Sequence, residues 1–134
     1  MDNSAKIQTK IKARAGEKNI LNCKAAHLLA QELDVEPLSL GQEATAMGVR
    51  ITCCQLGFFG FAEKKGMPGY KIVRQLENVP QTAAAAVQEA AQESRISCAA
   101  LWEIGQTLGI PRLEMGNIIE TLNIKTNSCQ LGCF

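Results

Sequence analysis

The chain has 134 residues, of which 46 % are apolar and 20 % are charged, and its formal net charge is +1. This length suits one domain or two very small ones, and the apolar fraction is sufficient for a hydrophobic core. No run of about 18 apolar residues could cross a bilayer, and the first residues do not have the pattern of a secretion signal. We therefore expect a cytoplasmic protein with no membrane partner, whose six cysteines are reduced thiols.

The first element in chain order is a helix predicted over residues 5–18, in which Ile7 and Ile11 are one turn apart. Residues 1–18 also hold five basic and two acidic side chains. We therefore predict that this segment is a basic N-terminal arm or a first helix.

Two helices are predicted next. Asn22 is a good N-cap, because its short side chain can accept a hydrogen bond from the free amides of a first helical turn. Apolar residues then recur at helical spacing as far as Leu33, where Asp34 and Val35 interrupt the helix. Pro37 suits the first turn of a second helix, over about residues 38–47.

Strand-like and loop segments follow these helices. The run "VRITCCQL" at 49–56 precedes a glycine-punctuated loop, and "YKIVRQL" at 70–76 is a second strand-like run. Residues 61–76 hold four basic and one acidic side chain. We interpret residues 60–79 as a basic wing or linker, before an alanine-rich helix predicted over 80–94.

The chain then repeats itself. A shift of 75 residues aligns residues 22–59 with residues 97–134 without a gap, so that "CQLG" at 54–57 falls on "CQLG" at 129–132. The second copy predicts an N-cap at Ser97, helices from 98 to 108 and from 111 to 122, and a strand-like run at 124–131. Such a period is that of a mini-domain. We expect two copies related by pseudo-twofold symmetry, with Leu56 and Leu131 packed inward and the strands of the two copies paired with each other.

Each copy resembles a helix-turn-helix. The resemblance rests on four positions in each copy: a small residue (Ala30, Gly105), a turn residue (Asp34, Gly109), an apolar residue (Val35, Ile110) and an apolar anchor (Leu40, Met115). A further helix precedes each motif and a strand-like run follows it, an order that is similar to a winged helix. Only the first copy has a second strand-like run for a wing hairpin. The predicted fold is thus mainly α with short β-strands, divided into 1–18, the first repeat at 19–59, the wing at 60–79 and the second repeat at 80–134.

This resemblance implies a DNA-binding transcriptional regulator of a bacterium or archaeon, whose partner is double-stranded DNA. The residues expected to contact DNA are Lys10, Lys12, Arg14, Gln42, Thr45, Arg50, Lys64, Lys65 and Lys71. In the second copy, Arg112, Asn117 and Thr121 would face the bases. Glu43 and Glu120 would oppose phosphate binding, and the first copy is the expected reader.

The alternative is a protein-interaction module, or a homodimer, on the same scaffold. Cys23, Cys54, Cys98 and Cys129 occupy equivalent places in the two copies, and four thiolates are the right number for zinc or an iron–sulfur cluster. The absence of any C-x-x-C spacing favours buried packing cysteines and no cofactor. Cys129 and Cys133 are the most plausible reactive pair.

Enzyme chemistry is not predicted, because we find no paired carboxylates, phosphate-binding glycine motif or nucleophile elbow. The one histidine, His27, is expected at a helix surface. Phe58, Phe59 and Phe61 are expected to fill space between the two units.

Overall fold

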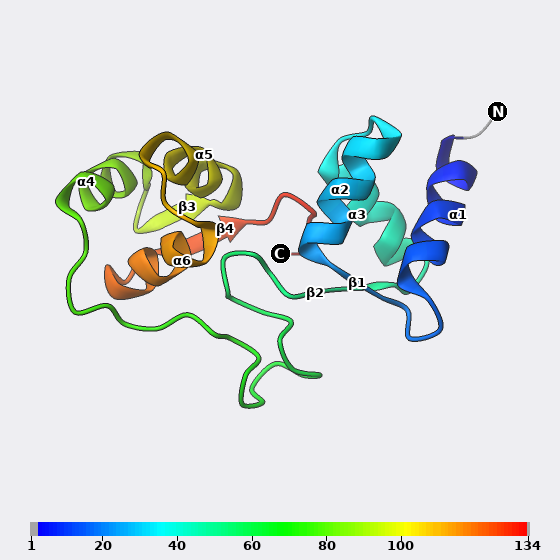
Figure 1. The fold of residues 1–134 in the computed structure, drawn as a ribbon, viewed down its shortest axis with the longest axis horizontal. Coiled ribbons are helices and arrows are strands. Elements are labelled where there is room, and N and C mark those ends of the chain that lie inside the picture. The colour runs from blue at the N-terminus through cyan, green and yellow to red at the C-terminus, as the bar shows by residue number, and fades with distance from the viewer. Residues whose placement is uncertain (1–2, 134) are drawn as a thin grey trace.

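The computed structural model describes residues 3–133. Residues 1 and 2 of the predicted segment 1–18 and residue 134 of the predicted segment 80–134 lie outside the described residues. Within it the chain forms six helices and two short parallel two-stranded sheets, arranged as two similar halves (Figure 1). This confirms the mainly helical class with short strands. None of the helices in the described range is long and apolar enough to span a membrane.

The two halves have the same element order. The first contains α1 (Asn3–Ala15), β1 (Ile20–Asn22), α2 (Cys23–Leu33), α3 (Pro37–Ala46) and β2 (Arg50–Thr52). The second contains α4 (Gln81–Ala90), β3 (Arg95–Ser97), α5 (Cys98–Leu108), α6 (Arg112–Thr121) and β4 (Lys125–Ser128).

Caps and turns fold each helical pair as the sequence predicts. Asn22 Oδ1 accepts a hydrogen bond from the Ala25 amide at 2.7 Å, and Ser97 Oγ accepts one from the Ala100 amide at 3.1 Å. Asp34 and Gly109 end α2 and α5 in the left-handed conformation, with φ of 55° and 72°. These residues close the last helical turn and redirect the chain into the next helix.

A small residue lets the helices of each pair cross closely. A Cβ at Gly105 would lie 2.8 Å from the Ile110 carbonyl oxygen and 2.9 Å from Met115 Cγ. In the first half, Ala30 and the anchor Leu40 are both buried. The predicted pairing of a small residue with an apolar anchor is therefore present in both halves.

The predicted strand pairing is wrong. β1 pairs with β2 and β3 pairs with β4, in parallel and within each half. Closing the helical pair brings the strand after it beside the residues before it, as in the hydrogen bond from the Arg50 amide to the Asn19 carbonyl. The predicted strand at 70–76 is also absent, and so is the wing hairpin that it would complete. Two amides of this segment instead donate hydrogen bonds to side chains of α6.

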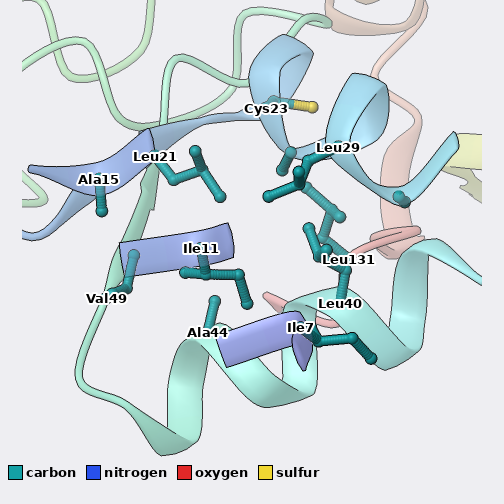
Figure 2. Close-up of a cluster of buried hydrophobic side chains, with 12 residues drawn as sticks. Ile7, Ile11, Ala15, Leu21, Cys23, Leu29, Leu40, Ala44, Val49 and Leu131 are labelled. Carbon is teal, nitrogen blue, oxygen red and sulfur yellow. The ribbon is translucent and has the colours of Figure 1, made fainter. Parts of the chain in front are cut away.

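The repeated "CQLG" segments cross between the halves. Leu131 is 1 % exposed and belongs to the core of the first half, beside Leu29 and Leu40 (Figure 2). Leu56 is also 1 % exposed and belongs to the core of the second half. Each half therefore completes the hydrophobic core of the other. The leucines do pack inward, as predicted, but into the opposite copy.

Two glycines admit the exchanged segments. The Leu131 carbonyl lies against Gly41 of α3, and the Leu56 carbonyl lies against Gly116 of α6, in positions that a Cβ would occupy. The two glycines are 75 residues apart, as are the two leucines. The contact is therefore the same in both directions.

Candidate nucleic-acid interface

The outer face of α3 is open to solvent. Five exposed residues at helical spacing form this face, namely Leu38, Ser39, Gln42, Thr45 and Ala46. Two of them, Gln42 and Thr45, are positions that the sequence predicts for DNA contacts. The outer face of α3 carries no charged side chain; its polar groups are the Gln42 amide, the Ser39 hydroxyl and the Thr45 hydroxyl, which donates to the Gly41 carbonyl at 3.0 Å.

Glu43, which was expected to oppose phosphate binding, does not lie on the outer face of α3. Its carboxylate accepts hydrogen bonds from Ser4 Oγ at 2.6 Å and Gln8 Nε2 at 3.0 Å, both on α1. These bonds lower the pKa of Glu43 and hold the side chain toward α1. The one acidic residue of α3 is thereby turned away from its outer face.

The equivalent face of α6 is covered by residues 71–76. The Arg74 amide donates to Asn117 Oδ1 at 2.9 Å, and the Leu76 amide donates to Thr121 Oγ1 at 2.8 Å. Asn117 is only 5 % exposed. The expectation that Asn117 and Thr121 could read bases is therefore wrong, because both are already bonded to the protein's own backbone.

Arg112, the third residue expected to read bases from α6, lies over a tryptophan. Its Cζ is 3.5 Å from the ring centroid of Trp102, and its Nη1 donates to Gln55 Oε1 at 2.6 Å. Trp102 also contacts His27, and the centroids of the two rings are 4.4 Å apart. Burial and the charge of Arg112 lower the pKa of His27 to about 4, so this imidazole is neutral at pH 7.

A groove of about 920 Å³ lies where the two halves meet. Its lining includes residues that are 75 positions apart, among them the pairs Arg50 with Lys125, Val49 with Ile124, and Phe58 with Cys133. Thr45 reaches the groove from the outer face of α3. The two surfaces are therefore continuous.

Several predicted cations converge on this groove. Arg50, Lys65 and Lys71 line it together with Lys125. Lys71 Nζ lies 2.7 Å from a carboxylate oxygen of Glu120, which also lines the groove. The groove is basic overall, because the carboxylate of Glu120 is paired and the cations outnumber it.

The cations of α1 are not brought together. α1 is a folded helix that buries Ile7 and Ile11 in the first core, not a loose arm. At about 100° per residue, Lys10 and Arg14 lie on one side of the helix, where Arg14 pairs with Glu32 of α2 at 2.9 Å. Lys12 lies on the other side, in line with Gln8 and α3. Among the cations of α1, Lys12 is thus the one on the side of α3.

Three of the four cysteines proposed as metal ligands, Cys23, Cys54 and Cys98, are buried packing residues. Cys23 and Cys98 are buried and accept hydrogen bonds from Gln55 and Gln130, each at 3.6 Å. Burial raises the pKa of Cys23, and it raises the pKa of Cys98 to about 12, which disfavours the thiolate that a metal requires. Within residues 3–133 no three His, Cys, Asp or Glu side chains are placed to hold a metal ion.

Cys129 differs from Cys23, Cys54 and Cys98, the other three cysteines at equivalent positions of the repeat. Its sulfur accepts a hydrogen bond from the Leu131 amide at 3.4 Å. A hydrogen bond from Cys133 lowers the pKa of Cys129 to about 6, and the same contact raises the pKa of Cys133. The predicted reactive pair is thus in contact.

Sequence reasoning missed Lys125 and Tyr70 as lining residues of the groove. The duplication itself held the signal for Lys125, because this residue is 75 positions after Arg50. No sequence signal placed Tyr70 there.

Comparisons with protein-family models, with curated proteins and with solved structures found no match to this chain.

Proposed function

We propose that the protein is a double-stranded-DNA-binding regulator in which α2 and α3 form a helix-turn-helix and α3 lies in the major groove. The sharp left-handed turn at Asp34 and the close crossing at Ala30 and Leu40 support this assignment. Contacts between equivalent residues, such as His27 with Trp102, support a pseudo-twofold arrangement of two such units.

One observation carries the proposal, namely that α3 has a free outer face whereas α6 does not. The polar side chains of the α6 face bind residues 71–76, but their counterparts on α3 are exposed. In this proposal Gln42 and Thr45 contact base edges. Gln is well suited to this role, because its amide can donate to and accept from one adenine.

Phosphate contacts would come from Lys12 beside α3 and from Lys64 in the loop of residues 60–79. This loop takes the place of the winged-helix hairpin that the structure lacks. Each cation that neutralises a phosphate releases condensed counterions, so binding should weaken as salt rises.

Fluorescence anisotropy of a labelled random-sequence duplex, measured over a salt titration, tests the proposal. We expect Lys12→Gln and Lys64→Gln each to reduce the slope of log affinity against log salt by about 1. Arg95→Gln is the matched control, since it removes the same charge from an exposed position in the second half. An unchanged slope in the two lysine variants, or an equal loss in the control, would count against DNA binding.

Base reading requires a second experiment on a duplex selected from a random library. Gln42→Ala should weaken binding to the selected duplex by about 1–3 kcal/mol and leave binding to random duplex unchanged. Equal weakening on both duplexes would assign Gln42 to backbone contact only.

A second candidate is a protein-interaction module. It is favoured by residues 71–76, which lie as an extended chain along the face of α6 that is equivalent to the outer face of α3. An extended peptide on α3 would find Ala46 where α6 offers the hydroxyl of Thr121, and so would lose one of those bonds. Three observations together would favour this candidate: the protein binds a peptide independently of salt, Gln42→Ala abolishes that binding, and no DNA binding is detected.

A further inference from the structure

The groove between the halves has the size of a small-molecule site. Its volume of about 920 Å³ falls within the ~300–1,000 Å³ that is usual for ligand pockets. Sites at the junction of two structural units are also common places for small ligands. A DNA duplex, in contrast, is bound over an extended surface, so α3 reading DNA does not by itself explain this cavity.

The charge of the groove favours an anion with several negative charges. Glu120 and Lys71 form an ion pair at 2.7 Å and offset each other. Arg50, Lys65 and Lys125 remain, and within residues 3–133 none of these three belongs to an ion pair. They come from β2, the loop and β4, so their charges meet only because the two halves pack together.

Aromatic rings stand beside these cations. Phe58, Phe59 and Tyr70 line the same groove and are all half-buried. Aromatic side chains of this kind provide flat surfaces on which a nucleobase can stack whatever its identity. Arg50 and Lys125 carry the kind of group that makes charge-assisted hydrogen bonds to phosphate oxygens.

We infer that the groove between the halves binds a nucleoside phosphate, with the base against the aromatic rings and the phosphates between Arg50 and Lys125. The site is separate from the outer face of α3, although Thr45 lies at the border of both. It would give a DNA-binding protein a small-molecule signal, but the binding itself does not depend on DNA.

Isothermal titration calorimetry of the full chain without DNA tests the inference, with adenosine diphosphate as the first probe. Adenosine and inorganic pyrophosphate are the two matched probes, since each keeps one half of the ligand. We expect adenosine diphosphate to bind at least about tenfold more tightly than either, because stacking and charge-assisted bonds both contribute. Guanosine and uridine diphosphates then show whether the base is selected.

Variants locate the binding. Arg50→Gln and Lys125→Gln should each weaken the affinity for adenosine diphosphate about tenfold, and Tyr70→Leu should weaken it about fivefold or more. All three side chains line the groove outside the two hydrophobic cores, so the fold should persist, which circular dichroism can verify. Lys6→Gln removes an exposed charge from α1, outside the groove, and should leave the affinity unchanged.

Three results would overturn the inference. They are the absence of adenosine diphosphate binding, equal affinity for pyrophosphate and adenosine diphosphate, and an equal loss of affinity in Lys6→Gln and Arg50→Gln. Failure of the DNA experiments would leave the calorimetry intact, because the titration contains no DNA. The two proposals can therefore fail separately.

Discussion

Substitution of Gly41 by alanine should destabilise the protein, although the same change in an ordinary helix interior stabilises by about 0.5–1 kcal/mol. The reason is that the new Cβ would occupy the position of the Leu131 carbonyl. That atom belongs to the backbone and cannot rotate away. We expect the exchanged segment to be displaced, at a cost of about 1–3 kcal/mol, as for other overpacked sites.

A second substitution, Leu131→Ala, removes the side chain that the exchanged segment inserts into the core of the first half. Leu131 is 1 % exposed within the core of the first half, so this truncation should cost about 3–5 kcal/mol. Once Gly41→Ala has displaced the segment, much of this contact is already lost. The double variant should therefore be more stable than the sum of the single variants predicts, by about 1–2 kcal/mol.

This coupling is measured by urea unfolding at low temperature of the wild type, the two single variants and the double variant, followed by the fluorescence of the single tryptophan. The matched control is Gly41→Ala combined with Leu56→Ala, because Leu56 lies in the core of the second half. That pair should be additive to within about 0.5 kcal/mol. Additivity with Leu131 together with coupling to Leu56 would refute the exchange between halves.

Three further predictions concern other contacts. The pKa of His27 is lowered from 6.5 to about 4, so as the pH falls the unfolded chain binds a proton before the folded chain does, and folding stability is lost. Between pH 6.5 and 4 the free energy of unfolding of the wild type should fall by about 1–2 kcal/mol more than that of His27→Gln, after allowance for the partial exposure of the ring. Arg112→Met removes the cation over Trp102, so it should cost about 0.5–2 kcal/mol and raise the pKa of His27 in an NMR titration. Asn117→Ala leaves the Arg74 amide without its acceptor and should cost about 1–3 kcal/mol, with faster hydrogen exchange across residues 71–76.

Each of these three has an outcome that contradicts it. The histidine prediction fails if wild type and variant lose stability in parallel. The arginine prediction fails if the pKa of His27 is unchanged or falls. The asparagine prediction fails if exchange accelerates equally in residues 71–76 and in α2, since that would indicate global unfolding.

Local signals in the sequence predicted the helices well. Asn22, Ser97 and Pro37 begin helices, and Asp34 and Gly109 end them, because capping and turn chemistry depend on a few neighbouring residues. The wing strand failed for a different reason. Residues 70–76 have a strand-like pattern, but two of their amides donate to side chains of α6 and two others donate to the Gly57 carbonyl. No local pattern identifies such distant acceptors.

The exchange between halves could not be predicted from the repeat. Leu56 and Leu131 are equivalent, so either core could be completed by either leucine with the same residues and the same pattern. Only the path of the chain after β2 and β4 decides between the two arrangements. For the same reason the sequence predicted Arg50 as a DNA-contacting cation but did not show that Lys125 would line the same groove.

The crossed leucines also determine how this molecule should respond to a protease. A nick in the exposed loop at residues 63–69 would break the covalent link between the halves, yet each fragment would still hold a side chain locked inside the other. We expect the two fragments to migrate together in a native gel and to separate only under denaturing conditions. The pair would then behave as an interlocked heterodimer made from a single gene.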